Sequence, residues 1–326
     1  MGRCSGENIE KTENYGYKGD LCMSIAVVFP GQGAQYAGMG LDWFEGSEKA
    51  KAVFTTACDI LGGEFREIMF NGPEEELKRT DITQPAILVH SAMVYEVIKE
   101  KIGQPAFFAG HSLGEYSALL AAGALDLENA IKMVKTRGLL MQEASVKVKS
   151  SMAAVMGLPK DRIEELCGKA DGYLALANIN SPAQIVVSGE QSAVDSAEAI
   201  AKEMGAKRYI KLPVAGAFHS EIMRPAAEAM AAVIEEFKVN DALVPVISNV
   251  TAQEAVKAGD IRELLIKQIV SPVKWVESVE YMKSKGAVKF VEAGPGAVLS
   301  GLIKKTDRSL ECVNIDKFED IKKLEN

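Results

Sequence analysis

Short apolar runs alternate with amphipathic stretches along the chain from residue 24 onward. The runs SIAVVFPG (24–31) and PAFFAG (105–110) are short, apolar and end in Gly, which predicts buried strands. Residues 84–101 carry apolar positions at helical spacing, and residues 113–122 form a helix-like run closed by Gly123. This alternation is typical of an α/β protein with a largely parallel sheet.

The order of predicted elements changes between residues 148 and 213. They follow one another as strand, helix, strand, strand, helix, strand: SMAAVMGL, PKDRIEELCGKA, YLALANI, AQIVVSG, EQSAVDSAEAIAKEMG and AKRYIKLPV. This βαββαβ order is that of a ferredoxin-like unit. The α/β rhythm then resumes with VPVISNV and AVKFVEAG. We therefore predict a large α/β subdomain of residues 23–147 and 214–326, with residues 148–213 inserted as a small ferredoxin-like subdomain.

The first 22 residues differ from the rest of the chain, because they are polar and contain no apolar core segment. We expect residues 1–22 to be a flexible N-terminal extension rather than a signal peptide or a membrane anchor. No later stretch is long and apolar enough to span a bilayer. The five cysteines are odd in number and scattered, which favours reduced thiols and a cytoplasmic location.

Composition and charge narrow the class of protein further. The 326 residues are 48% hydrophobic and 25% charged, as in a soluble globular protein with ample material for a core. The formal net charge of -8 argues against a nucleic-acid binder, for which a basic footprint is expected. It leaves room for a local basic patch that docks an acidic partner.

The sequence contains neither a complete nucleotide-binding motif nor a pair of histidines at metal-ligand spacing. GQGAQYAG (31–38) lacks the third glycine of a dinucleotide fingerprint, since Tyr36 occupies that position, and it lacks the Gly-Lys-Ser/Thr ending of a P-loop. The histidines, His90, His111 and His219, form no pair at the spacing of helical metal ligands. The sequence therefore predicts no metal site.

Ser112 lies in Gly110-His111-Ser112-Leu113-Gly114, which matches the G-x-S-x-G nucleophile elbow in a strand-turn-helix context. Small residues on either side let strand and helix pack closely around such a sharp turn. The hydroxyl then lies at the start of a helix, where unpaired N–H groups stabilise negative charge. The alternative is a helix N-terminus that uses Ser112 only as its cap.

A nucleophilic serine needs a base, and elimination leaves His219. His111 is adjacent in the chain and is expected to point away from the hydroxyl on so sharp a turn. His90 lies in an apolar helical run and is expected in the core. His219 lies in a loop after a predicted strand, where catalytic bases are common. No acidic residue is singled out as its partner, so a histidine steadied by a carbonyl group remains open.

Arg137 falls at the edge of an apolar stripe formed by Ile131, Val134, Gly138 and Met141. A guanidinium that points inward needs an anion, and its planar fork suits a carboxylate. Together with an elbow serine, this favours an acyl substrate with a free carboxylate at its far end. A structural salt bridge is the alternative.

Ordered sequence blocks resemble the malonyl-CoA:acyl carrier protein transacylases of fatty-acid synthesis and the acyltransferase domains of polyketide synthases. The resemblance runs from about residue 24 to at least residue 305, in FPGQGAQ, TQPA, GHSLGEY, RGLLMQEA, NINSPAQIVVSG, GAFHS, SPVKW and EAGPGAVLSGL. It implies an α/β-hydrolase-like large subdomain with an inserted ferredoxin-like small one.

The same resemblance implies a role for each matching residue. Ser112 corresponds to the acylated nucleophile, His219 to its general base and acid, and Arg137 to the clamp on the malonyl carboxylate. The remaining positions are Gln32 and Leu113 as backbone donors to the oxyanion, Gln268 as the residue that steadies the histidine, and Met141 and Phe218 as substrate-binding residues. Phe218 is expected to limit the room for an α-branch.

The implied activity is transfer of malonyl from malonyl-CoA to the phosphopantetheine thiol of holo-acyl carrier protein for fatty-acid synthesis, through a malonyl-serine ester. No bound cofactor is implied, and we expect a monomer without nucleic-acid or membrane partners. The alternatives are a polyketide pathway, a serine esterase or thioesterase, and a non-catalytic carrier-binding module. Lys304, Lys305 and Arg308 are either a docking patch for the acidic carrier or a solvated helix end.

Overall fold

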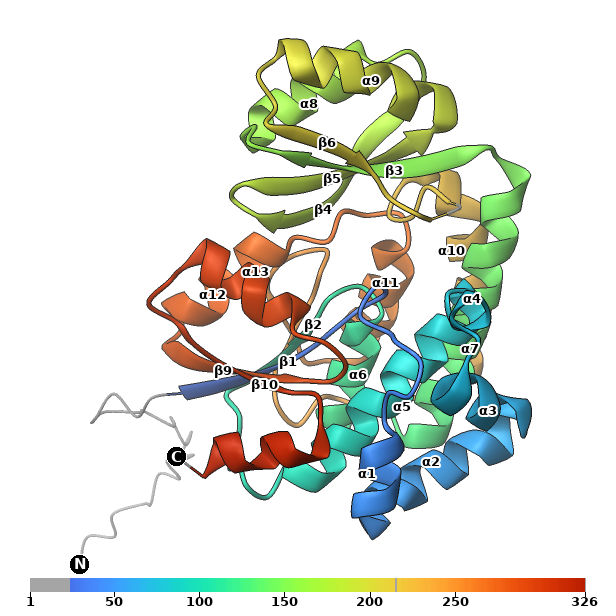
Figure 1. Ribbon diagram of the computed structural model, residues 1–326, viewed down its shortest axis with the longest axis vertical. Coiled ribbons are helices and arrows are strands. Elements are labelled where there is room, and N and C mark those ends of the chain that lie inside the picture. Colours follow the sequence, from blue (N-terminus) through green and yellow to red (C-terminus); the bar gives the residue numbers. More distant parts are fainter. Residues whose placement is uncertain (1–23, 215, 326) are drawn as a thin grey trace, which may run out of the picture.

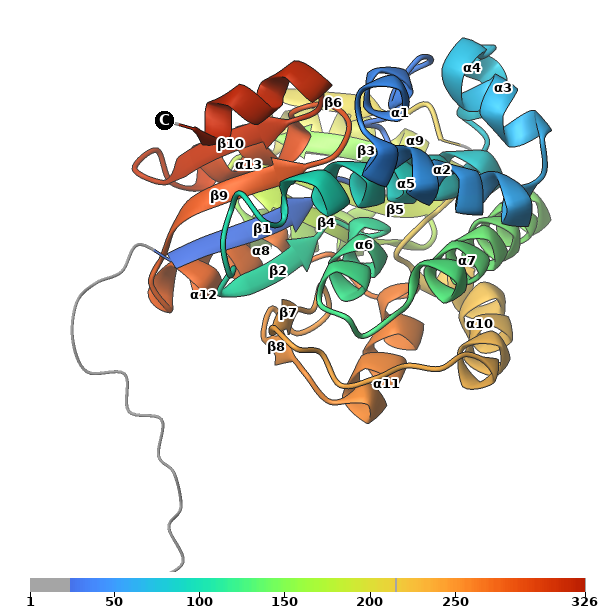
Figure 2. The same ribbon diagram turned by 90° about the horizontal axis from the view of Figure 1, so that it is seen from below.

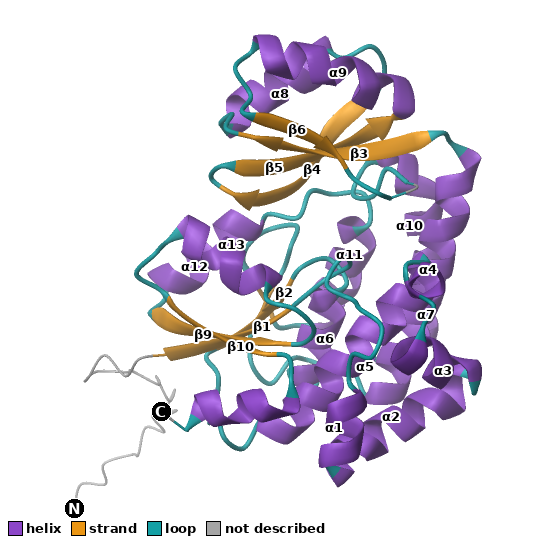
Figure 3. Ribbon diagram, in the orientation of Figure 1, coloured by secondary structure: helices purple, strands orange, loops and turns teal. Residues whose placement is uncertain are grey.

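The chain folds around two separate sheets, one large and one small (Figure 1). A computed structural model describes residues 24–214 and 216–325. The extension predicted for residues 1–22 lies outside the described residues. Coloured by secondary structure, the two sheets lie apart, each with its own helices (Figure 3). The α/β class with a large, mainly parallel sheet and a small antiparallel sheet is confirmed.

The large sheet has the strand order β10-β9-β1-β2-β7-β8. Every neighbouring pair is parallel except β7 and β8. Its strands are β1 (Ser24–Phe29), β2 (Phe107–Gly110), β7 (Val246–Ile247), β8 (Glu254–Ala255), β9 (Ala287–Ala293) and β10 (Glu311–Ile315). Parallel strands need crossover connections, and here helices and the small subdomain supply them.

Both faces of the large sheet are buried under helices, as parallel sheets require. Along β1, Val27 and Phe29 face one apolar cluster, whereas Ala26 and Val28 face the other. In the view from below, α2, α5 and α7 run side by side on one side (Figure 2). The helices of this subdomain are α1 (Leu41–Gly46), α2 (Glu48–Leu61), α3 (Glu64–Asn71), α4 (Glu74–Leu77), α5 (Thr80–Ile98), α6 (Gly114–Ala121), α7 (Leu127–Lys147), α10 (Arg224–Glu236), α11 (Ala258–Gln268), α12 (Trp275–Ser284) and α13 (Val298–Thr306), with 3-10 turns η1 (Glu221–Met223) and η2 (Phe318–Leu324).

The small sheet is antiparallel and has the strand order β4-β5-β3-β6. Its elements are β3 (Ser150–Met156), α8 (Lys160–Lys169), β4 (Leu174–Ser181), β5 (Gln184–Glu190), α9 (Gln191–Glu203) and β6 (Arg208–Lys211). This is the βαββαβ order that the sequence predicts. The exact subdomain boundaries at residues 148 and 213 stay a prediction.

Several elements start or end a few residues from their predicted bounds, and two of these differences bear on the site. Helix α5 begins at Thr80 rather than at residue 84, because the N–H of Thr83 donates to the oxygen of Arg79 at 2.7 Å and so closes a helical turn before Pro85 is reached. Strand β7 covers only Val246 and Ile247 of the run 244–250. Two residues further on, Asn249 leaves the sheet to bind the turn after β2.

The site forms where β1 and β2 end side by side. Phe29 pairs with Gly110 at the carboxyl ends of these parallel strands, so the loops that follow leave the sheet at the same edge. Ligands of open α/β sheets bind beyond this edge. None of the helices within the described part of the chain has the length and apolar character needed to cross a bilayer.

Candidate active site

Ser112 sits on a sharp turn between β2 and α6, with a positive φ of 51°. A Cβ on Gly110 would lie 2.0 Å from the backbone of Gly114, and a Cβ on Gly114 would lie 2.1 Å from the carbonyl oxygen of Phe29. Both glycines are therefore required by close backbone contact. The turn exposes the hydroxyl to a cavity, as a nucleophile elbow does.

His219 faces this hydroxyl from the loop between β6 and η1. Its Nε2 lies 2.8 Å from Oγ of Ser112, and its Nδ1 lies 2.9 Å from the backbone oxygen of Gln268. Because a carbonyl oxygen only accepts, Nδ1 carries the proton and Nε2 is free to accept one from Ser112. The orienting group is thus a carbonyl at the end of α11 rather than an acid.

The ring of His219 is neutral in this environment. Burial lowers its pKa to about 3, and the nearby guanidinium of Arg137 acts in the same direction. A neutral imidazole that faces a hydroxyl is the form required of a general base.

The other two histidines do not touch Oγ of Ser112. Nε2 of His111 lies 2.8 Å from Oδ1 of Asn180, and its ring packs 5.9 Å from that of Trp275. His90 is fully buried, and its Nε2 lies 3.1 Å from the backbone oxygen of Asp316.

Arg137 is 1% exposed and points from α7 into the site. Nη2 donates to Oγ of Ser112 at 3.1 Å and to Oε1 of Gln268 at 2.9 Å, and Nη1 donates to Oε1 of Gln84 at 2.6 Å. No carboxylate forms a salt bridge with this guanidinium within residues 24–214 and 216–325. The cation therefore remains available to an anion that enters the cavity.

Two buried residues that the sequence analysis missed support this arrangement. Oδ1 of Asn249 accepts from the backbone N–H of Ser112 at 2.7 Å, and its Nδ2 donates to the oxygen of Gly110 at 2.7 Å. Oε2 of Glu115 accepts from Nε2 of Gln268 at 2.7 Å and from the N–H of Asn249 at 3.1 Å. Glu115 follows directly after the elbow motif, which is the one signal that could have drawn attention to it.

These groups surround a cavity of about 110 Å³ beneath the small sheet. Met141 and Phe218 lie in its wall, as do the predicted backbone donors Gln32 and Leu113; the full lining is Gln32, Gln84, His111, Ser112, Leu113, Arg137, Met141, Met152, Asn178, Leu212, Val214, Phe218 and His219. Gln268 is not part of this lining. Its side chain accepts a hydrogen bond from Arg137 and its backbone oxygen accepts one from His219, and both of these residues line the cavity.

The loop that carries Gln32 presses against the elbow. A Cβ on Gly31 would lie 2.4 Å from the carbonyl oxygen of His111, so glycine permits this approach. Within the described residues, the backbone N–H groups of Gln32 and Leu113 have no hydrogen-bond acceptor. Two free N–H groups beside a nucleophile are what an oxyanion hole requires.

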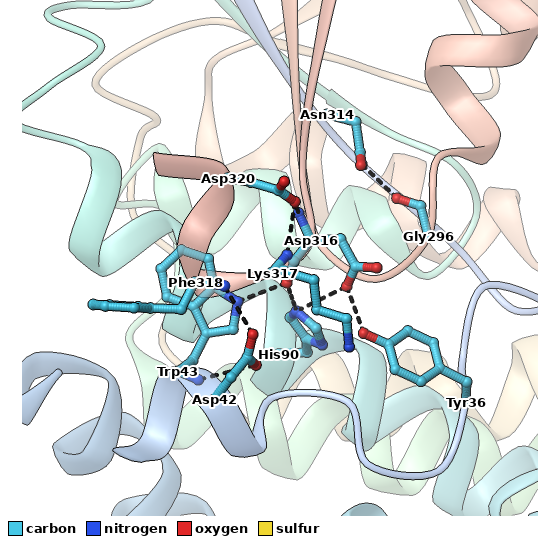
Figure 4. A network of polar contacts seen from close by, with 10 residues as sticks. All are labelled: Tyr36, Asp42, Trp43, His90, Gly296, Asn314, Asp316, Lys317, Phe318 and Asp320. Carbon is cyan, nitrogen blue, oxygen red and sulfur yellow. Dashed lines mark hydrogen bonds and ion pairs between the residues drawn. The ribbon is translucent and has the colours of Figure 1, made fainter. Parts of the chain in front are cut away.

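A second polar network fixes the far end of this loop (Figure 4). Oη of Tyr36 donates to Oδ1 of Asp316 at 2.7 Å, and Nε1 of Trp43 donates to its backbone oxygen at 2.6 Å. The N–H of Phe318 donates to Oδ2 of Asp42 at 2.8 Å. The segment after β10 thereby holds the loop that leads from β1 to α1.

Neither a metal site nor a disulfide is found in the described part of the chain. No three His, Cys, Asp or Glu side chains gather there in a way that could hold a metal ion. Cys58, Cys167 and Cys312 carry free thiols. Lys304 and Lys305 are exposed in the last turn of α13, close to Arg308.

An elbow serine beside a carbonyl-held histidine is the arrangement of enzymes that pass acyl groups through a serine ester, and a buried arginine without a carboxylate partner suits an acidic acyl group. The comparison with known families agrees, because residues 26–324 match the acyl transferase domain. The chain belongs to the acyl transferase family.

Named relatives make the comparison more specific. The chain is 45% identical to a malonyl CoA-acyl carrier protein transacylase of Bacillus subtilis over 91% of its own length and 95% of the relative. A malonyltransferase structure from Vibrio cholerae is 40% identical, with a TM-score of 0.89 over 92% of this chain and 99% of that one. A malonyl-transacylase in complex with a type II PKS acyl-carrier protein is 38% identical, with a TM-score of 0.89 over 92% and 98%.

Proposed function

We propose that this protein transfers the malonyl group from malonyl-CoA to the phosphopantetheine thiol of an acyl carrier protein, through a malonyl ester on Ser112. One observation carries the proposal. Oγ of Ser112 lies 2.8 Å from Nε2 of His219 and 3.1 Å from Nη2 of Arg137, so the nucleophile touches both a base and a cation. The names of the relatives support the same substrates.

In the first step, Oγ attacks the thioester carbonyl while its proton moves to Nε2 of His219. The oxygen-carbon bond forms, the carbon-sulfur bond breaks, and the proton leaves with the sulfur of coenzyme A. The N–H groups of Gln32 and Leu113 stabilise the oxyanion, an interaction worth about 3 kcal/mol for a single donor. The carbonyl of Gln268 steadies the imidazolium that forms transiently.

The second step reverses the first with a different thiol. The phosphopantetheine thiol gives its proton to His219 and attacks the ester, and the proton then returns to Oγ of Ser112. Arg137 binds the malonyl carboxylate in both steps, and Met141 and Phe218 border the acyl chain. No cofactor takes part in either step.

We also propose that the protein is cytoplasmic and monomeric. The free thiols of Cys58, Cys167 and Cys312 support a cytoplasmic location. The proposed assembly state is a monomer, in which nucleophile, base and cation all come from one chain. The pathway is fatty-acid synthesis, and service to a polyketide pathway is the second candidate, favoured by the carrier complex among the similar structures.

The experiment that tests the proposal follows the malonyl group after the enzyme is mixed with malonyl-CoA. Transfer to holo-carrier protein, with little free malonate when carrier is absent, is the expected result. Steady release of malonate without carrier contradicts the proposal and indicates a thioesterase. Activity with carrier proteins of the two pathways then separates them.

A further inference from the structure

Gln84 lies in the wall of the cavity and has no role in the steps described above. It belongs to α5 and is 1% exposed. Oε1 accepts from Nη1 of Arg137 at 2.6 Å, and Nε2 lies 3.6 Å from Sδ of Met141. The two ends of one carboxamide thus face very different partners.

The orientation of this carboxamide is fixed by chemistry. A guanidinium has five N–H donors and no acceptor, so only Oε1 of Gln84 can face Arg137. The amino group must then point the other way, towards Met141.

The packing of α5 on α7 places the two residues within reach of each other. A Cβ on Gly138, next to Arg137, would lie 2.8 Å from the carbonyl oxygen of Thr80. Glycine at this position lets the helices approach so closely that the short carboxamide of Gln84 reaches the guanidinium.

Nε2 of Gln84 is poorly satisfied where it stands. A thioether is a weak acceptor, and Sδ of Met141 is the acceptor available to Nε2 among the residues that the structure describes. A buried donor gains most when a charged acceptor replaces a weak one. A carboxylate beside Arg137 would be such an acceptor, since both side chains line the same cavity.

We propose that Gln84 is a substrate-binding residue that selects malonyl over acetyl groups, by donating from Nε2 to the carboxylate that Arg137 holds. This inference rests on the proposed function. An acetyl group ends in a methyl group, which cannot accept, so its binding leaves Nε2 against the thioether. The discrimination then comes from a donor that only the acidic substrate satisfies.

The test compares single-turnover acylation of Ser112 by malonyl-CoA and acetyl-CoA, read by intact mass. Gln84→Leu is expected to lower the malonyl-to-acetyl ratio of rate constants at least about tenfold, because a hydrogen bond to a charged group is lost. Gln253→Leu, on the exposed surface, is the matched control and leaves the ratio unchanged. An unchanged ratio in Gln84→Leu overturns the inference.

A double-mutant cycle separates direct binding from an effect through Arg137. In the Arg137→Lys background, which keeps a cation for the carboxylate but lacks the Nη1 that bonds to Gln84, Gln84→Leu is expected to lower the ratio several-fold more. No further decrease means that Gln84 only positions Arg137, which also overturns the inference. If Gln84→Leu fails to fold, Gln84→Asn decides, since its shortened amide loses the same contact. Absence of a malonyl adduct in the unmodified enzyme, by contrast, contradicts the proposed function itself.

Discussion

Glu115 accepts a hydrogen bond of 2.7 Å from Nε2 of Gln268, the residue whose backbone carbonyl faces His219. The same carboxylate accepts from the N–H of Asn249, which holds the elbow. A single buried acid therefore links the group that holds the turn of Ser112 to the group that orients His219. Burial raises the pKa of Glu115 to about 7, although these donors act against the rise.

The raised pKa of Glu115 makes its contribution to stability depend on pH. Between its ordinary pKa and about 7 the folded protein holds a proton that the unfolded chain has lost, so the contribution falls as the pH rises through this interval. Burial lowers the pKa values of His219 and His90, which act in the opposite sense. The comparison must therefore be made between the unmodified protein and Glu115→Gln.

We expect Glu115→Gln to gain stability relative to the unmodified protein as the pH rises from about 5 to about 8, by up to roughly 3 kcal/mol. Urea unfolding at several pH values measures this difference. If the two proteins change in parallel over the whole range, Glu115 does not titrate as described.

Asn249→Ala should weaken the elbow. The N–H of Ser112 and the oxygen of Gly110 both lose their buried partner, which we expect to lower the free energy of unfolding by about 2–3 kcal/mol. Displacement of Oγ of Ser112 should lower kcat at least about tenfold, with a smaller change in KM. Asn71→Ala, at an exposed helix end, is the control. Full activity in Asn249→Ala would contradict this role.

Arg137→Ala should change which acyl group is transferred. Removal of the cation is expected to lower kcat/KM for malonyl-CoA roughly hundredfold and to affect acetyl-CoA far less. Arg162→Ala, whose side chain pairs with Glu165 on α8, should leave both unchanged. Steady-state rates with both thioesters provide the measurement, and an unaltered malonyl preference would rule out Arg137 as the carboxylate clamp.

Much of the site could be predicted because it follows local sequence signals. The elbow around Ser112 is a contiguous motif, and the chain has only three histidines from which the base could be chosen. Gln268 entered through the family resemblance alone, and the sequence does not reveal that its backbone carbonyl rather than its side chain faces His219. Gln84 lies in the TQPA block of the resemblance but was given no role, and Asn249 carries no local signal, since their contacts depend on how α5 packs on α7 and where the chain leaves β7.

The fold could be predicted for a related reason. Apolar runs such as β1 and β2 mark strands buried on both faces, and their order along the chain determines the class. The start of α5 was missed because Pro85 lies inside the helix, and the short β7 was overestimated because Asn249 serves the elbow instead of the sheet.

The most direct measurement is the intact mass of the protein after brief incubation with malonyl-CoA, followed by peptide mapping. We expect one malonyl group per chain, attached to Ser112, absent in Ser112→Ala and removed by holo-acyl carrier protein. A malonyl group on another residue, or full transfer activity in Ser112→Ala, would contradict the mechanism.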